Sequence, residues 1–276
     1  MVNPLGDRMK ALERAGEDLT LSPDTPVYAR LDGRAFSSFT RSMKRPFDAR
    51  MTRAMTDTAE YLARETNAAA SFVQSDEISL LWRWRTAANP DGQALFGGRQ
   101  QKIVSVLSSL CSARFVSILA DDAYGLRDYL YRLPHFDARV VQMPDEETAA
   151  QMLAWRGADA RRNAVNQIGR SRFSHRALDG VPSSRLRRML NEIGEPVSGF
   201  PAENLYGVLM TRRTVEKALD TETLARIPAH RRPEGPIIRS EWTTVSFPLD
   251  KAVNLREVLF GAEEPRAEEA PALAGA

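Results

Sequence analysis

The chain has 276 residues, of which 43% are hydrophobic and 27% are charged, and its formal net charge is +2. This composition fits a globular protein that buries a full core. The single cysteine, Cys111, excludes an intramolecular disulfide and favours a reducing, cytoplasmic location. We see no apolar run of membrane-spanning length, and the charged start of the chain, residues 1–20, lacks a signal-peptide core. We therefore expect no membrane partner.

Residues 1–25 predict a short amphipathic helix followed by a proline-containing loop. The next run, Val27–Leu31, is apolar and β-branched enough to predict a strand, and it ends in an acidic turn, Asp32-Gly33-Arg34. A helix is then expected from Asp48, a plausible N-cap, to Asn67.

A second acidic turn lies between two further strand-like runs. Ser75-Asp76-Glu77 separates 71–74 from 78–82. An apolar helical face follows in 99–119, and another strand-like run covers 136–143. The order β-α-β-β-α-β is that of the ferredoxin-like unit, so we predict an α+β fold with an antiparallel sheet and the helices of the unit on one face.

In that unit the first and third strands are antiparallel neighbours at the centre of the sheet. The end of the first strand, Asp32, should therefore lie beside the start of the third, Asp76. Converging carboxylates repel each other unless a cation lies between them, and Mg²⁺ prefers one or two carboxylates together with waters and phosphate oxygens. The alternative is that both are ordinary turns, because Asp and Gly are favoured there.

Several short motifs occur in an order that resembles the tRNA-His guanylyltransferase family. They are Ala29-Arg30-Leu31-Asp32-Gly33-Arg34-Ala35-Phe36, Gln74-Ser75-Asp76-Glu77-Ile78-Ser79, Arg99-Gln100-Gln101-Lys102, Phe136-Asp137-Ala138-Arg139-Val140, and Trp155-Arg156 with Asp159 and Asn163. They cover roughly residues 26–175. The resemblance implies a polymerase palm that adds nucleotides to a tRNA 5′ end in the 3′-to-5′ direction, using two Mg²⁺ ions, after ATP activates the 5′ phosphate. It also implies GTP or other nucleoside triphosphates as substrates, and a tetramer.

The resemblance assigns roles to individual residues. Asp32, Asp76 and Glu77 would be catalytic, and the metal ligands would be Asp32, Gly33 and Asp76. Backbone N–H groups at a strand-to-helix turn can bind a triphosphate, and Lys44 and Arg45 stand before Pro46 as candidates for the same ligand. The expected nucleotide-binding residues are Gly33, Arg34, Ala35, Phe36, Ser37, Lys44, Arg45, Asp48 and Ser75. The expected RNA-binding residues are Arg99, Lys102, Arg156, Arg161, Arg162, Asn163, Arg187 and Arg188.

One departure from the family pattern concerns the substrate. The enzymes restricted to tRNA-His carry a His-Ile-Asn-Asn-type motif, whereas this chain has Arg161-Arg162-Asn163-Ala164-Val165-Asn166, with no histidine. That is similar to the bacterial and archaeal Thg1-like branch, which repairs truncated tRNA 5′ ends by templated addition.

The rest of the chain is helical, basic and then strand-like. A long helix is expected from Pro144 to about Ile168, another over 183–193, and strands at 205–214 and 237–247. Residues 156–188 contain nine arginines and two acidic residues, which favours a polyanionic partner, although a solvated helix face would look the same. We expect a catalytic domain over 1–145, a basic RNA-contacting extension over 146–260 and a disordered tail over 261–276.

Two other functions remain open at this point. A nucleotide cyclase or diguanylate-type synthase would share the palm and the paired acids, but it gives no reason for the arginine tract. A catalytically inactive RNA-binding palm would not need Asp32, Gly33, Asp76 and Glu77 together.

Overall fold

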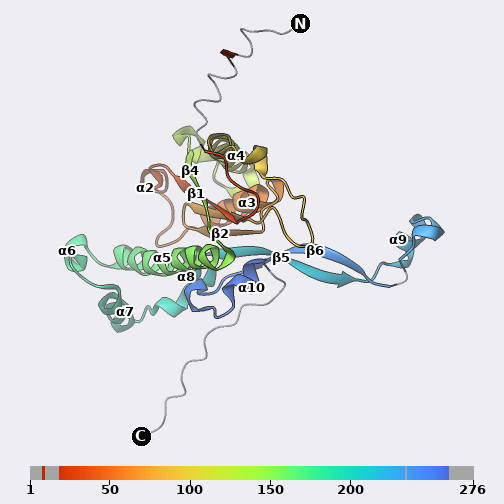
Figure 1. Ribbon diagram of the computed structural model, residues 1–276. Coiled ribbons are helices and arrows are strands. Elements are labelled where there is room, and N and C mark those ends of the chain that lie inside the picture. Colours follow the sequence, from red (N-terminus) through yellow and green to blue (C-terminus); the bar gives the residue numbers. More distant parts are fainter. Residues whose placement is uncertain (1–7, 10–18, 234, 261–276) are drawn as a thin grey trace.

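A six-stranded antiparallel sheet forms the centre of the molecule in the computed structural model (Figure 1). The structure describes residues 8–9, 19–233 and 235–260, so the expected N-terminal helix and C-terminal tail lie almost wholly outside it. The strands are β1 (Val27–Gly33), β2 (Ala70–Gln74), β3 (Glu77–Trp82), β4 (Phe136–Gln142), β5 (Val208–Lys217) and β6 (Ile237–Val245), in the spatial order β4-β1-β3-β2-β5-β6.

The first four strands have the ferredoxin-like arrangement that the sequence predicts. β1 lies between β3 and β4 and is antiparallel to both, with Asp32 opposite Glu77 in β3 and opposite Asp137 in β4. β2 and β3 form a hairpin through the turn at Ser75, which has a positive φ of 51°. The α+β palm-like fold is therefore confirmed.

Two helices cover one face of this sheet, α3 (Ala49–Glu65) and α4 (Gln100–Ala120). α3 begins at Asp48, as expected, because the Asp48 carboxylate accepts the Arg50 N–H and caps the helix. Leu107 and Phe115 of α4 are completely buried in the core that this face shares with β1 and β3.

α4 corrects one expectation. By length and composition it could cross a membrane, whereas we expected no apolar run of that length. Serines interrupt the apolar residues along this helix, so no long unbroken apolar run occurs in the sequence. Because Ile103, Leu107 and Ile118 pack into the core, α4 reads as a core helix of the fold.

The opposite face carries α5 (Glu146–Arg172) and α10 (Leu255–Phe260). α5 is longer than expected, and its second half packs against α7 (Ser183–Glu192) and α8 (Ala202–Tyr206) in a small separate cluster that includes Val165, Ile168 and Leu186. The remaining short helices are α2 (Phe36–Phe39), α6 (His175–Leu178) and α9 (Thr221–Arg226). The 3-10 turns are Leu95–Gly98, Asp122–Tyr124, Arg127–Arg132, Val197–Gly199, Ala229–Arg231 and Leu249–Lys251.

β5 and β6 add two strands beyond the ferredoxin-like unit. β5 pairs with β2, so the sheet continues from the predicted catalytic domain into the predicted extension. Beyond this pairing the two strands run on as a hairpin arm, with α9 at its tip (Figure 1). Both strands were predicted, and their observed bounds differ by a few residues at the turns.

Candidate active site

The two acidic turns lie side by side at one end of the central strands. Asp32 is directly opposite Glu77, and the Gly33 N–H donates to the Asp76 carbonyl oxygen at 3.1 Å. Burial raises the pKa of Asp76, and the negative charges of Asp32 and Glu77 raise it further. Three carboxyl groups, those of Asp32, Asp76 and Glu77, therefore lie near one another at this end of the strands.

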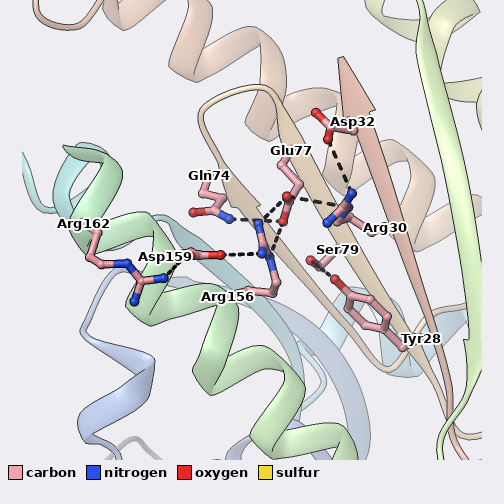
Figure 2. A network of polar contacts seen from close by, with 9 residues as sticks. All are labelled: Tyr28, Arg30, Asp32, Gln74, Glu77, Ser79, Arg156, Asp159 and Arg162. Carbon is pink, nitrogen blue, oxygen red and sulfur yellow. Dashed lines mark hydrogen bonds and ion pairs between the residues drawn. The ribbon is translucent and has the colours of Figure 1, made fainter. Parts of the chain in front are cut away.

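Glu77 is held by an arginine from helix α5 (Figure 2). Arg156 of α5 donates from Nε to Glu77 Oε1 at 2.7 Å and from Nη2 to Glu77 Oε2 at 2.5 Å. Both side chains are buried, with 8% and 10% of their surfaces exposed. This bidentate pair occupies both Glu77 oxygens, and the Gln74 amide donates to Oε1 as well, at 3.1 Å.

The same arginine leads outward along α5. Arg156 Nη1 donates to Asp159 at 2.6 Å, and the other Asp159 oxygen accepts from Arg162, which is 54% exposed. The chain Glu77, Arg156, Asp159, Arg162 thus runs from the buried sheet edge to the surface (Figure 2). On the other side of Glu77, Arg30 forms longer ion pairs of 3.6 Å with Asp32 and 3.8 Å with Glu77.

Arg156, which we expected to contact RNA, is buried. Ala149, Leu153 and Ala160, on the same helical face, are also buried. That spacing is visible in the sequence and could have placed Arg156 on the sheet side of the helix. The guanidinium holds Glu77 of the β2–β3 hairpin and, although largely buried, lines the cavity described next.

A cavity of about 620 Å³ opens next to these carboxylates. Its walls come from α2, the loop before α3, the β2–β3 turn, α5 and α8. Asp32, Ser75, Asp76 and Glu77 line it together with Ser37, Lys44, Arg45 and Asp48, so the structure gathers most of the expected nucleotide-binding residues around one space. Asn163 of the expected RNA-binding group lines it too.

Asp48 shapes the basic loop of this cavity. Its carboxylate accepts the Arg50 guanidinium at 2.7 Å and the Lys44 backbone N–H at 3.2 Å. The hydrogen bonds from the Arg50 side chain lower the pKa of Asp48 to about 2. Asp48 therefore fixes the loop that carries Lys44 and Arg45.

The turn after β1 is packed more tightly than expected. A Cβ on Gly33 would lie 2.3 Å from the Phe36 ring, so glycine is required here by the ring. Phe36 is buried among Phe39, Phe115 and Phe136, and it also lines the cavity. Ala35 has a positive φ of 57° at the start of α2, and Arg34 is exposed with His135 3.4 Å away.

The expected RNA-binding residues do not all converge. Arg99 and Lys102 lie at the start of α4, near Thr20 and hence near the beginning of β1, at the far end of the strand from Asp32. Arg161 pairs with Asp250 at 2.5 Å. Arg187 and Arg188 lie on α7, where Arg188 is exposed.

Several cavity residues were missed. Asn166, Gln167 and Arg170 of α5 and Asn204 of α8 line the cavity. The recurrence of Asn163, Asn166, Gln167 and Arg170 on one side of a helix is a signal that the sequence contains. The part played by α8 could not be found, because it depends on packing far along the chain.

The donors at the sheet edge fit a divalent cation. Asp32 and Asp76 supply two carboxylates, and burial, with the nearby charges of Asp32 and Glu77, raises the pKa of Asp76. Within the described ranges no group of three or more His, Cys, Asp or Glu side chains is arranged to hold a metal. Two carboxylates are what Mg²⁺ uses when phosphate oxygens and waters complete its coordination.

Comparisons with known proteins agree with this geometry. A family model described as tRNAHis guanylyltransferase matches residues 6–144. An uncharacterized protein of Acanthamoeba polyphaga mimivirus is 30% identical over 77% of this chain and 78% of its own length. A tRNA(His) guanylyltransferase of Debaryomyces hansenii is 30% identical over 60% of each chain, so the match spans less than two thirds of that relative.

Solved structures give the same result. A bacterial tRNA(His) guanylyltransferase (Thg1)-like protein in complex with ATP aligns with a TM-score of 0.68 and 28% identity, covering 75% of this chain and 88% of the other. A bacterial Thg1-like protein in complex with GTP aligns with a TM-score of 0.65 and 25% identity, covering 88% and 91%. With a family model that matches half of its length and a paired-carboxylate edge in the same fold, the chain belongs to the tRNA-His guanylyltransferase family.

Proposed function

We propose that this protein is a nucleotidyltransferase that adds nucleotides to the 5′ ends of tRNA, in the 3′-to-5′ direction. The observation that carries the proposal is the meeting of Asp32 and Asp76 beside a cavity lined by Lys44 and Arg45. A nucleoside triphosphate has the charge and the size for that space. The ATP and GTP bound by the bacterial structural relatives support the same ligand class.

The residues of the chain have separate tasks in this reaction. Lys44 and Arg45 bind the triphosphate, and Asp48 fixes their loop. Asp32 and Asp76, with the Gly33 carbonyl, would hold Mg²⁺, which lowers the pKa of an attacking hydroxyl and offsets charge in the transition state. Glu77 was expected to be a further ligand or base. Because Arg156 occupies both of its oxygens, we assign Glu77 to holding the β2–β3 turn.

The order of events follows from the family chemistry. The 5′ phosphate of the RNA attacks the α-phosphorus of ATP and displaces pyrophosphate, which leaves an adenylylated 5′ end. The 3′-hydroxyl of the incoming nucleotide then loses its proton to solvent and attacks the RNA 5′ phosphorus, so that a phosphodiester bond forms and AMP leaves. No side-chain nucleophile is needed. The one cysteine is unsuited to that role, because Cys111 is buried and burial raises the pKa of its thiol.

We propose 5′-truncated tRNA as the substrate, because the Arg161–Asn166 stretch has no histidine. The test uses 5′-truncated tRNAs of several identities and full-length tRNA-His, each incubated with nucleoside triphosphates and Mg²⁺, with products sized at single-nucleotide resolution. We expect truncated tRNAs to be extended whatever their identity. Extension of tRNA-His alone would contradict the repair assignment, and extension of none would contradict the proposed function.

A further inference from the structure

Two arginines lie directly opposite each other on β1 and β4, next to the catalytic edge. Arg30 pairs in register with Arg139, and the next pair on the same face is Asp32 with Asp137. Because side chains two positions apart on a strand share a face, both arginines are only about 7 Å along the strands from the Asp32 position. They lie on the α5 face, since Arg30 reaches Glu77 there (Figure 2).

This part of the sheet face is open. In β4, Phe136 and Val140 are buried on the α4 side, whereas Asp137, Arg139 and Val141 are exposed. α4 is the helix that packs on β4, and it lies on the other face. Arg139 is therefore accessible to a ligand that approaches beside α5.

The hydrogen-bonding capacity of the two arginines is largely unused. The Arg30 contacts with Asp32 and Glu77, at 3.6 and 3.8 Å, are too long for hydrogen bonds, and Arg30 Nε is buried with no hydrogen-bond partner. Arg139 has no ion pair with any residue that the structure describes. Like charges directly opposite each other on a sheet destabilise it unless an anion lies between them. A phosphate group would fit, because the guanidinium fork binds two phosphate oxygens at once.

The identity of that phosphate follows from where the site is. Arg139 does not line the 620 Å³ cavity, whose basic residues Lys44 and Arg45 we assign to the triphosphate. The proposed reaction brings a second phosphate to Asp32, that of the RNA strand. Resting on the proposed function, we propose that Arg30 and Arg139 bind the 5′-terminal phosphate of the RNA and hold it beside Asp32.

The test compares truncated tRNAs with a 5′ phosphate and with a 5′ hydroxyl, binding to the full-length protein in Mg²⁺ without nucleoside triphosphate. We expect the wild-type protein to bind the phosphorylated RNA about 10-fold more tightly, which is what about 1.4 kcal/mol of charge-assisted hydrogen bonding gives. Arg139→Gln should reduce that ratio to about 1, because the site loses the exposed guanidinium that would bind two phosphate oxygens. Arg139→Lys, which keeps the charge, should give an intermediate ratio.

Arg239→Gln is the matched control. Arg239 is also exposed on an edge strand, but on β6 at the opposite edge of the same sheet. It should leave the ratio unchanged. Arg30→Gln, with its fold checked by thermal unfolding, should act like Arg139→Gln.

Three results would overturn the proposal. The wild type could bind both RNAs equally, or Arg139→Gln could keep the preference for the 5′ phosphate. Arg139→Gln could also weaken ATP binding as much as RNA binding, which would assign the site to the triphosphate. Because binding is measured without chemistry, these outcomes are separate from a failure of the wild type to add nucleotides, which would count against the proposed function alone.

Discussion

Successive side chains of β1 point to opposite faces of the sheet, and the two faces differ in their surroundings. Val27, Ala29 and Leu31 are completely buried under α3 and α4. Tyr28, Arg30 and Asp32 point to the other face, where Glu77 and Arg156 are also found. The first face is apolar along the whole strand. The second face is apolar only at Tyr28, which packs in a buried cluster with Phe72 and Leu81, and becomes charged towards the end of the strand at Arg30 and Asp32. The buried side chains of β1 thus fix the strand that carries the catalytic carboxylate of Asp32.

We expect the largest loss of activity when a carboxylate at the end of the charged face is removed. Asp32→Ala and Asp76→Ala should each lower the rate of nucleotide addition by about 1,000-fold or more, because each removes a metal ligand that contributes several kcal/mol to the transition state. Asp32→Asn should be nearly as damaging, since it keeps the shape and loses the charge. Single-turnover assays at saturating Mg²⁺ measure this. Near-normal turnover of either alanine variant would exclude these residues as ligands.

The next largest effect concerns the ion pair beneath α5. Arg156→Ala should lower the free energy of unfolding by about 3–5 kcal/mol, because it leaves the buried Glu77 with only the Gln74 amide and the longer Arg30 contact. Arg162→Ala is the control on the same helix, and it should cost no more than about 1 kcal/mol, since that guanidinium is 54% exposed. Urea unfolding of both variants decides the matter. Equal, small losses would mean that the pair contributes little.

Much of this comparison could be predicted from the sequence, because the order of elements and the two acidic turns determine which strand ends meet. The pairing of Arg156 with Glu77 could not, since it depends on which side of α5 faces the sheet. Arg30 was read as one member of an apolar run. That Arg30 lies opposite Arg139 could not be predicted, because the register between distant strands is set by the packing of both faces of the sheet. The extension of the sheet by β5 likewise depends on contacts across the whole chain.

Asp48 makes the free energy of unfolding depend on pH. Its pKa of about 2 lies below the usual unfolded value of about 3.9, so its stabilising contribution is present above about pH 4 and is lost as the pH falls towards 2. Asp48→Asn should therefore be less stable than the wild type at pH 7, by about 1–2 kcal/mol after allowance for the partly exposed Arg50. The two proteins should converge near pH 2. A stability difference that stays constant with pH would exclude this ion pair as its cause.

The smallest expected effect distinguishes arginines within the basic tract. Arg188→Ala should make the log–log salt dependence of RNA affinity shallower by about 0.7 to 0.9, because one phosphate contact is lost. Arg161→Ala should leave the slope unchanged, since Arg161 is paired with Asp250. Filter binding across a salt series measures both. An unchanged slope for Arg188→Ala would identify this part of the tract as a solvated surface.

The apolar core under α3 and α4 should determine stability, and the carboxylates at the strand end should determine activity. This is tested most directly by two variants, Asp76→Asn and Leu107→Ala, each measured for unfolding and for nucleotide addition. The pKa of Asp76 is raised, so its charge costs stability at neutral pH, and Asp76→Asn should be as stable as the metal-free wild type or more stable, yet inactive. Leu107→Ala, in the buried face of α4, should lose about 2–5 kcal/mol of stability and keep its activity per folded molecule. An active Asp76→Asn, or one that unfolds more easily than Leu107→Ala, would contradict the account.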